Sequence, residues 1–301
     1  MTSAPLIHIG PRPQRPLPQL AWPERLARLR AELAALGRVV VAYSGGVDSS
    51  LLLRVAHDTL GEGALGVIGR SDSYSSRELA LALDQAASFG ARTRVVTTGE
   101  LADPNFRSNP ADRCYHCKSE LYRELSRVAA EFKAAAILDG TIADDLLDHR
   151  PGRRAAAEHE VRSPLAELGF GKSDVRAAAG HLGLKSAQKP ASPCLASRIP
   201  YGTEITRENL AMVERAEEAL RSLGFAEVRV RHYGDTARIE VPLSDLASLA
   251  RAGMRERVVE VLKVAGYARV TLDLEGFRSG SLNESLPGAF WAAEMRPRGD
   301  S

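Results

Sequence analysis

Long apolar runs, cysteines and net charge are all scarce in this chain. None of its 301 residues lies in an uninterrupted apolar run of the ~18 residues that a transmembrane helix needs, so we expect no membrane-spanning segment. Its three cysteines are too few for the disulfide framework of an extracellular domain. A net charge of +2 gives no reason to expect nucleic acid or a membrane as the main partner. Together these absences predict a cytoplasmic protein.

The N-terminus lacks the apolar core of a secretory signal and is instead rich in proline. We expect residues 1–22 to be disordered and residues 286–301 to form a flexible tail. The chain between them is long enough for two domains. Its composition, 44% apolar and 26% charged residues, is typical of a globular protein.

Strands and helices alternate along the first half of the chain. Apolar runs predict strands at 39–44, 64–68, 94–98 and 136–139, and helical patterns follow the first three at 49–60, 76–89 and 118–133. Such alternation is typical of an α/β fold with a doubly wound parallel sheet, which binds its ligands beyond the C-terminal ends of the strands. We assign this domain to residues 23–190.

The pattern changes after residue 190. A helix is predicted at 207–223, followed by strands at 227–233 and 236–241, helices near 244–264 and a last strand at 269–274. This order predicts a smaller α+β domain over residues 191–285, connected through the proline-marked stretch 189–202.

A serine- and glycine-rich loop follows the first predicted strand. Glycines let its backbone approach a ligand closely, and the N–H groups of the loop and of the next helical turn have no internal partner. Such a loop binds anions, and a carboxylate within it requires a cation as well, so we expect magnesium and pyrophosphate there. The spacing and the missing lysine exclude a Walker A motif. The residues expected to bind are Ser44, Gly45, Gly46, Asp48, Ser49 and Ser50.

The three cysteines allow several kinds of chemistry. Cys114 and Cys117 form a C-x-x-C pair, and Cys194 stands alone after two prolines. A redox pair, a zinc site completed by His116, and buried inert thiols are three of the alternatives. In the fourth alternative, three thiolates hold three irons of a 4Fe–4S cluster and leave the last iron open to another ligand. The residues alone do not decide between zinc and a cluster.

Several segments carry a resemblance to known families. Residues 44–49, Ser-Gly-Gly-Val-Asp-Ser, resemble the signature of the PP-loop ATP pyrophosphatases, which cleave ATP into AMP and pyrophosphate. Over residues 25–285 the chain resembles the LarE family, sulfur transferases that make the nickel-pincer nucleotide cofactor of lactate racemase. The motifs that carry this second resemblance are residues 109–118, 139–145, 150–152, 163–165, 193–198 and 276–283.

The family resemblance implies a reaction. ATP, with Mg²⁺ and Asp48, adenylates a carboxylate of pyridinium-3,5-biscarboxylic acid mononucleotide, and sulfur then displaces AMP to give a thiocarboxylate. In one branch of the family the cysteine matching Cys194 gives up its own sulfur and becomes dehydroalanine. In the other branch three cysteines hold a 4Fe–4S cluster whose bound sulfide is the donor. Since Cys114, Cys117 and Cys194 fill all three positions, we favour the cluster.

The resemblance also implies substrate-binding residues and partners. Arg229 and Arg231 alternate on a predicted strand, so both project from one face and are expected to clamp a phosphate. A trimer-based homo-oligomer, a sulfide donor and a nickel-insertion protein are the expected partners. Asp144 and Asp145, after the fourth strand, are placed to meet ATP or magnesium. The remaining candidates for substrate contact are Ser197, Arg198, Glu217, Glu240 and Arg278.

Two other functions remain open at this point. A tRNA 2-thiolation enzyme also combines this loop with three cysteines, but it needs a basic surface for the phosphate backbone. A non-catalytic nucleotide- or zinc-binding regulator would need neither Asp48 nor a cysteine beside the ATP site.

Overall fold

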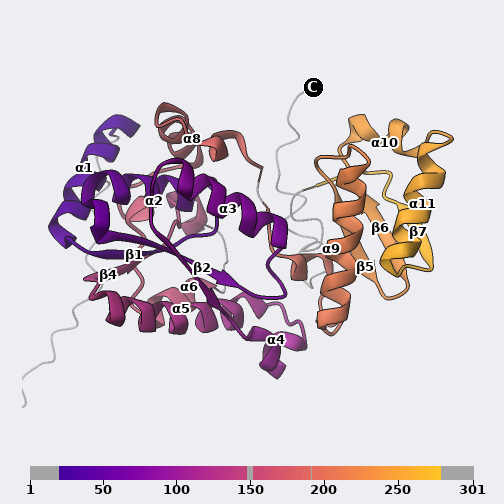
Figure 1. Ribbon diagram of the computed structural model, residues 1–301, viewed down its shortest axis with the longest axis horizontal. Helices are drawn as coiled ribbons and strands as arrows, with labels where there is room; N and C mark the ends of the chain where they lie inside the picture. Colours follow the sequence, from indigo (N-terminus) through magenta and orange to yellow (C-terminus); the bar gives the residue numbers. More distant parts are fainter. Residues whose placement is uncertain (1–19, 148–151, 191, 279–301) are drawn as a thin grey trace, which may run out of the picture.

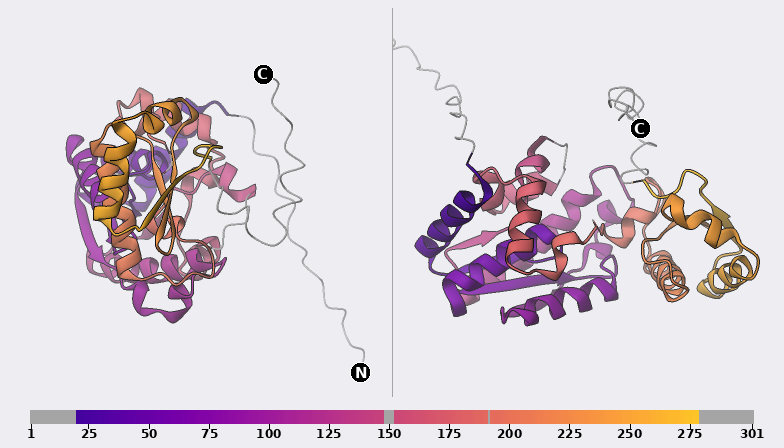
Figure 2. Two further views of the ribbon diagram at one scale, coloured as in Figure 1. Left: turned by 90° about the vertical axis from the view of Figure 1, so that its right-hand side faces the viewer. Right: turned by 90° about the horizontal axis from the view of Figure 1, so that it is seen from above.

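Two lobes, each with its own sheet and core, make up the described part of the chain. The computed structural model describes residues 20–147, 152–190 and 192–278. The larger lobe carries a four-stranded sheet and the smaller one a three-stranded sheet, and they lie side by side in Figure 1 and in the right-hand view of Figure 2. The predicted tail 286–301, most of segment 1–22, and Arg150 and Pro151 lie outside the described residues.

The sheet of the larger lobe is parallel throughout. Its strands β1 (Val39–Ala42), β2 (Ala64–Arg70), β3 (Thr93–Thr97) and β4 (Ala136–Leu138) lie in the order β3-β2-β1-β4. Val40 pairs with Leu65 on one side and Ile137 on the other, so β1 is central. Its three valines are fully buried, as expected of a strand covered on both faces.

Helices cover both faces of this sheet (Figure 1). On one face lie α1 (Trp22–Leu36), α2 (Val47–Leu60), α3 (Ser76–Ser88) and α8 (Lys172–His181), and on the other α5 (Arg113–Phe132) and α6 (Gly152–Glu158). The short helices α4 (Pro104–Arg107) and α7 (Pro164–Glu167) complete the lobe. The doubly wound α/β fold predicted from the sequence is confirmed.

The smaller lobe is built on a mixed sheet. Strand β6 (Thr236–Glu240) is central, antiparallel to β5 (Arg229–Tyr233) and parallel to β7 (Arg269–Leu272). Helices α9 (Arg207–Ser222), α10 (Leu243–Ala250) and α11 (Met254–Ala265) pack with it around a separate apolar core. Helix α9 begins at a Thr206 cap, whose hydroxyl accepts a hydrogen bond from the amide of Asn209 at 3.1 Å.

Side chains and backbone groups from both lobes meet between them. Arg207 of α9 pairs with Asp72 at 3.1 Å, and Glu214 accepts a hydrogen bond from the amide of Ser76 at 2.6 Å. The amide of Leu195 donates to the carbonyl of Ser73 at 2.8 Å. Among the described helices, none combines the length and apolarity that crossing a bilayer requires.

Candidate active site

The Ser/Gly loop joins β1 to the N-terminus of α2 and reaches its sharp turn at Gly45. This residue has φ of 68°, and a β-carbon on it would lie 2.7 Å from the β-carbon of Ala82 in α3. Only glycine fits this combination of backbone angle and close packing. Gly46 is extended and forms the N-cap of α2, so the unpartnered amides of the first turn face the loop.

Hydrogen bonds within the loop hold its hydroxyl groups in place. Ser44 Oγ and Ser49 Oγ are 3.1 Å apart, and Ser49 Oγ donates to the carbonyl of Gly46 at 3.2 Å. Ser44 is exposed and Asp48 half-buried, whereas Ser50 is fully buried behind the loop. Ser44 and Asp48 are therefore the loop side chains that a ligand meets first.

Two lysines that the sequence analysis missed approach this loop. Lys172, the first residue of α8, places Nζ 3.0 and 2.9 Å from the two carboxylate oxygens of Asp48. Lys189 donates to Glu78 at 2.6 Å and reaches the carbonyl of Gly45 at 3.4 Å. Neither was found because the segments are far apart in the sequence.

The acidic pair after β4 holds the local backbone in this structure. Asp144 accepts a hydrogen bond from the amide of Lys172 at 2.8 Å, and Asp145 accepts one from the amide of Ile142 at 3.2 Å. Gly140 lies so close to α2 that a β-carbon there would be 2.7 Å from the amide nitrogen of Ser49. The end of β4 thus supports the Ser/Gly loop directly.

The three cysteines come from two segments and lie within electrostatic reach of one another. Helix α5 begins at Arg113, five residues earlier than predicted, so Cys114 and Cys117 stand on its first turns rather than in a loop. Cys194 precedes a short 3₁₀ turn over Leu195–Arg198. Cys117 and Cys194 pack against the same apolar cluster, which contains Phe106 and Leu195.

The protein environment raises the pKa values of two of these thiols. Burial raises the pKa of Cys117 well above its usual value, and the nearby charges of Glu100, Cys194 and Cys114 raise it further. Partial desolvation also raises the pKa of Cys114, although the side chain as a whole is exposed. Within residues 20–147, 152–190 and 192–278, no three His, Cys, Asp or Glu side chains form a group that could hold a metal ion.

Asn109 ties the two cysteine segments together. It is fully buried with φ of 54°, and its side-chain amide donates to the carbonyls of Ile199, Pro200 and Thr203 at 3.2, 2.7 and 3.0 Å. Its carbonyl oxygen accepts a hydrogen bond from Arg113 at 2.6 Å. Asn109 therefore fixes the chain after Cys194 against the start of the helix that carries the other two cysteines.

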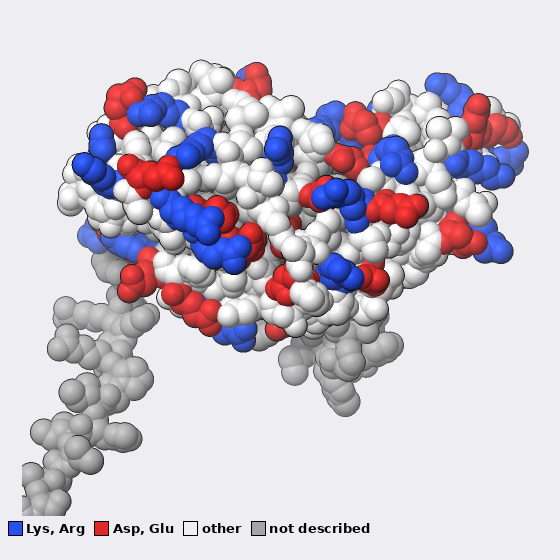
Figure 3. All heavy atoms as spheres, turned by 60° about the horizontal axis from the view of Figure 1, so that its bottom comes forward, with Lys and Arg blue, Asp and Glu red and all other residues white. Residues whose placement is uncertain are grey.

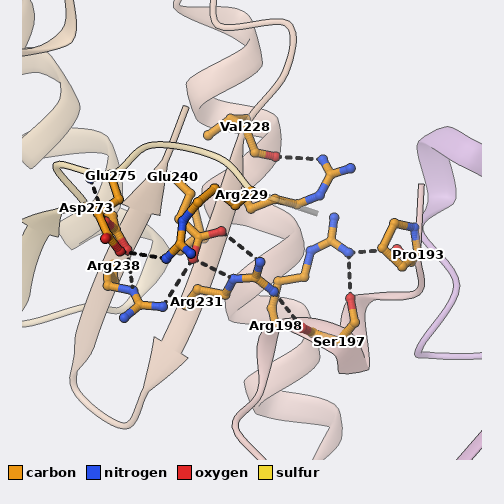
Figure 4. Close-up of polar contacts among 12 residues, drawn as sticks. Pro193, Ser197, Arg198, Val228, Arg229, Arg231, Arg238, Glu240, Asp273 and Glu275 are labelled. Atoms are coloured by element: carbon orange, nitrogen blue, oxygen red, sulfur yellow. Dashed lines mark hydrogen bonds and ion pairs between the residues drawn. The ribbon is translucent and has the colours of Figure 1, made fainter. Parts of the chain in front are cut away.

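A buried ion pair lies next to Cys194. Arg198 Nε donates to Glu217 at 2.7 Å, and both side chains are 2% exposed. The same guanidinium donates to the carbonyl of Pro193 at 2.7 Å (Figure 4) and to that of Cys194 at 3.1 Å. Burial alone would raise the pKa of Glu217, but the positive charges of Arg198, Arg221 and Arg229 outweigh it and lower that pKa.

The two arginines of β5 differ in their surroundings. Arg231 donates to both carboxylate oxygens of Glu240 at 2.9 and 2.7 Å, and to the carbonyl of Ser197 at 2.8 Å (Figure 4). Arg229 lies over the ring of Phe277, 5.1 Å from its centroid. Burial and the nearby charge of Arg198 lower the pKa of Arg229 to about 10.

Arg278, the last of the expected substrate residues, pairs with Glu275 at 2.6 Å within its own loop. Glu240, besides holding Arg231, accepts a hydrogen bond from Arg238 at 3.1 Å. The structure therefore gathers Ser197, Arg198, Glu217, Arg229, Arg231 and Glu240 near Cys194, most of them visible in Figure 4, and leaves Arg278 at the end of the described chain.

Two neighbouring cavities lie between the Ser/Gly loop and the residues around Cys194. A small one is lined by Cys194, Arg198, Glu217 and Tyr74, and the hydroxyl of Tyr74 donates to the carbonyl of Ser44 in the loop at 2.9 Å. A cavity of about 570 Å³ adjoins it, between the ends of β2 and β3 and helix α9, and is also lined by Tyr74. Its volume is in the range of small-molecule sites.

The fold and the loop define the class first. A Ser-Gly-Gly-x-Asp-Ser turn from the central strand of a parallel sheet to a helix, without a Walker lysine, is the nucleotide-binding element of the PP-loop ATP pyrophosphatases. A glutamine-hydrolysing GMP synthase chain of Halobacterium salinarum, for example, is 29% identical over 210 residues, which cover 62% of this chain and 66% of that protein. No protein-family model matches the chain.

More similar relatives define the family within this class. The chain is 43% identical over 261 residues to the pyridinium-3,5-bisthiocarboxylic acid mononucleotide synthase of Lactiplantibacillus plantarum, covering 86% of this chain and 94% of that one. It is 45% identical over 262 residues to an uncharacterised protein of Synechocystis sp., covering 87% and 98%. The chain belongs to the family of pyridinium-3,5-bisthiocarboxylic acid mononucleotide synthases, as its resemblance to the LarE family predicted.

Proposed function

We propose that this protein uses ATP to convert the carboxylates of pyridinium-3,5-biscarboxylic acid mononucleotide into thiocarboxylates. One observation carries the proposal: Tyr74 joins the ATP-binding loop to the hollow beside Cys194, so activation and sulfur transfer have adjoining sites. In this assignment residues 23–190 bind ATP, and residues 191–285 bind the mononucleotide and help to deliver sulfur.

The first half-reaction activates a carboxylate, which is otherwise a poor electrophile. A substrate carboxylate oxygen attacks the α-phosphorus of ATP, and the electron pair of the broken bond leaves with pyrophosphate. The amides of the first turn of α2 and the hydroxyls of Ser44 and Ser49 hold the phosphates. In the described structure the amides of Ser44 and Gly46 instead donate to serine hydroxyls within the loop, at 3.2 and 3.5 Å. Asp48 would bind the magnesium ion that accompanies them, since its carboxylate is half-buried at the start of α2 and magnesium prefers oxygen ligands.

The second half-reaction replaces AMP with sulfur at the activated carbon. The guanidinium groups of Arg198 and Arg221 line the hollow beside Cys194, and their positive charges favour binding of the anionic substrate there. Arg229, which lies close enough to Arg198 to feel its charge, is a further proposed contact for the substrate phosphate. Glu217 and Glu240 hold Arg198 and Arg231 in place, so we assign these carboxylates to positioning of the arginines. Ser197 and Arg278 remain proposed substrate contacts.

We propose further that the sulfur comes from a 4Fe–4S cluster held by Cys114, Cys117 and Cys194. Two observations support this proposal: three thiols from two segments influence one another's charge, and apolar residues flank two of them. In the described structure the three side chains are not grouped closely enough to hold a metal ion, so the cluster would have to draw them together. Binding to iron would overcome the raised pKa values of Cys114 and Cys117. The cluster would supply a sulfide held beside the activated carbon.

Anaerobic turnover distinguishes this donor from sacrificial transfer of the Cys194 sulfur. The purified protein is assayed for iron and sulfide, then incubated with Mg²⁺, ATP, sulfide and the mononucleotide. We expect bound iron, release of pyrophosphate and AMP, more than one thiocarboxylate per chain, and an unchanged intact mass. Loss of one sulfur from an iron-free chain would support the sacrificial mechanism. Undiminished multiple turnover by Cys114→Ala would instead show that the C-x-x-C pair is not needed, and would refute the three-cysteine cluster.

The remaining alternatives predict other outcomes. A tRNA 2-thiolation enzyme would bind tRNA with steep salt dependence, whereas the net charge is +2 and acidic and basic side chains are interspersed on the face in Figure 3. A nucleotide- or zinc-binding regulator would bind ATP without releasing pyrophosphate. We propose a cytoplasmic, trimer-based homo-oligomer that receives sulfide from a donor and passes its product toward a nickel-insertion protein.

A further inference from the structure

The ATP-binding loop has no lysine of its own, but the fold brings one to it. Lys172 Nζ lies 3.0 and 2.9 Å from the two oxygens of Asp48, although the residues are 124 positions apart. Asp48 stands at the N-terminus of α2, where the free amides favour an anion. A lysine at this point therefore lies where the phosphates of ATP are expected.

The backbone of Lys172 is firmly held. Its amide donates to Asp144 at 2.8 Å, and the preceding amide, that of Gly171, donates to Asp174 at 3.0 Å. Asp174 is paired in turn with Arg25 of α1. The start of α8 is thus fixed from three directions, which places the root of the lysine side chain at the loop.

The side chain of Lys172, by contrast, can move. It is 43% exposed, and Asp48 is its only hydrogen-bond partner among the described residues. Lys189 differs, because it is 20% exposed and held by Glu78, which lies outside the loop. Of the two lysines near the loop, Lys172 is the one whose ammonium can exchange a loop carboxylate for a phosphate oxygen.

We propose that Lys172 is a catalytic residue of the adenylation step. In the nucleotide-free protein its ammonium neutralises Asp48. When ATP binds, the ammonium moves to an oxygen of the β- or γ-phosphate, and Asp48 becomes available to the accompanying cation. As the bond between the α-phosphorus and the bridging oxygen breaks, Lys172 stabilises the negative charge that develops on pyrophosphate; it transfers no proton.

The first test measures binding and does not depend on the sulfur-transfer reaction. Inorganic pyrophosphate with Mg²⁺ is titrated calorimetrically into the full-length protein and into Lys172→Gln, Lys172→Arg and Lys185→Gln. Lys185 is the matched control, because it is exposed and pairs with Asp84 away from the loop. We expect Lys172→Gln to weaken pyrophosphate binding by about tenfold or more, as for one charge-assisted hydrogen bond, and the other two to bind within about threefold of wild type.

The second test measures pyrophosphate release in a single turnover with ATP and the mononucleotide. Lys172→Gln should lower the rate constant by about 10²–10³-fold, the usual cost of one donor to a developing charge. The adenylation step rests on the proposed function, and the controls separate the two. Absence of release from wild type would refute the proposed function, whereas the binding result would still report on Lys172.

Two outcomes would overturn the role of Lys172. One is a Lys172→Gln protein that binds pyrophosphate and releases it within about threefold of wild type. The other is a variant with unchanged pyrophosphate binding but a lowered melting temperature, because a residue that only neutralises Asp48 would affect folding and not phosphate binding. Partial recovery by Lys172→Arg in both assays would support the proposed role.

Discussion

Replacing Asn109 with alanine should loosen the contact between the two cysteine segments. The side-chain amide has two N–H groups for three buried carbonyls, and its oxygen accepts from Arg113. Removing it forfeits two ordinary hydrogen bonds and one to a charged group, about 3–5 kcal/mol in all. Alanine also tolerates the φ of 54° poorly, which adds about 1 kcal/mol.

Hydrogen exchange measures this loss locally. The amides of Gly202 and Ile205 donate to the carbonyls of Asn109 and Arg107 at 3.0 and 2.8 Å, so their opening free energy should fall by about 3–5 kcal/mol in Asn109→Ala. Crosslinking of Cys114 to Cys194 by a short bifunctional thiol reagent should slow in parallel. Asn109→Gly is the matched control, because it loses the same hydrogen bonds without the backbone strain and should be less destabilised. A loss below about 1 kcal/mol in Asn109→Ala, or unchanged crosslinking, would refute the reasoning.

Three further results are expected. Gly45→Ala should abolish ATP binding and lower the free energy of unfolding by about 2–4 kcal/mol, because its β-carbon would lie 2.7 Å from the β-carbon of Ala82. Gly46→Ala is the control: its β-carbon would lie 3.4 Å from the nearest atom, so this variant should be as stable as wild type in a denaturant titration. Burial lowers the pKa of His232 below its usual value of 6.5. Below about pH 6.5 the unfolded chain therefore binds a proton at His232 that the folded chain does not. The free energy of unfolding should fall by up to about 1.4 kcal/mol per pH unit until the pH drops below the folded-state pKa. Urea titrations at pH 7.5 and 5.5 check this, and an equal slope in His232→Gln would contradict it. Cys194→Ala should release pyrophosphate but form no thiocarboxylate by mass spectrometry; loss of both activities would place Cys194 in the activation step.

The strands were predictable because their sequences carry their own signal. The valines of β1 and the apolar run of β2 are buried on both faces, so each strand was located to within two residues at either end. Helix α8 was missed because its buried face is formed by Val175, Ala178 and Ala179, which are too small to give a clear helical period. The early start of α5 was hidden by polar residues around its first turn.

The candidate site likewise has a part that the sequence predicts and a part that it does not. The Ser/Gly loop is local in sequence, so its place between a strand and a helix could be predicted, and the binding roles of its residues stay a prediction. The contact of Lys172 with Asp48 and the hydrogen bonds from Asn109 to the carbonyls after Cys194 join segments 90 residues or more apart, and no spacing rule reveals them. Arg231 was expected to face a phosphate, and the pairing of β5 with β6 adds the carboxylate of Glu240 beside it.

The split origin of the three cysteines has a consequence for how the protein matures. Cys114 and Cys117 stand on the larger lobe, while Cys194 lies in the chain that leads to the smaller one and is tied back through Leu195 and Ser73. Anything that binds all three thiols also favours the docked arrangement of the two lobes, by thermodynamic linkage. The sulfur site should therefore be filled after folding, and its occupant should protect the junction between the lobes against proteolysis.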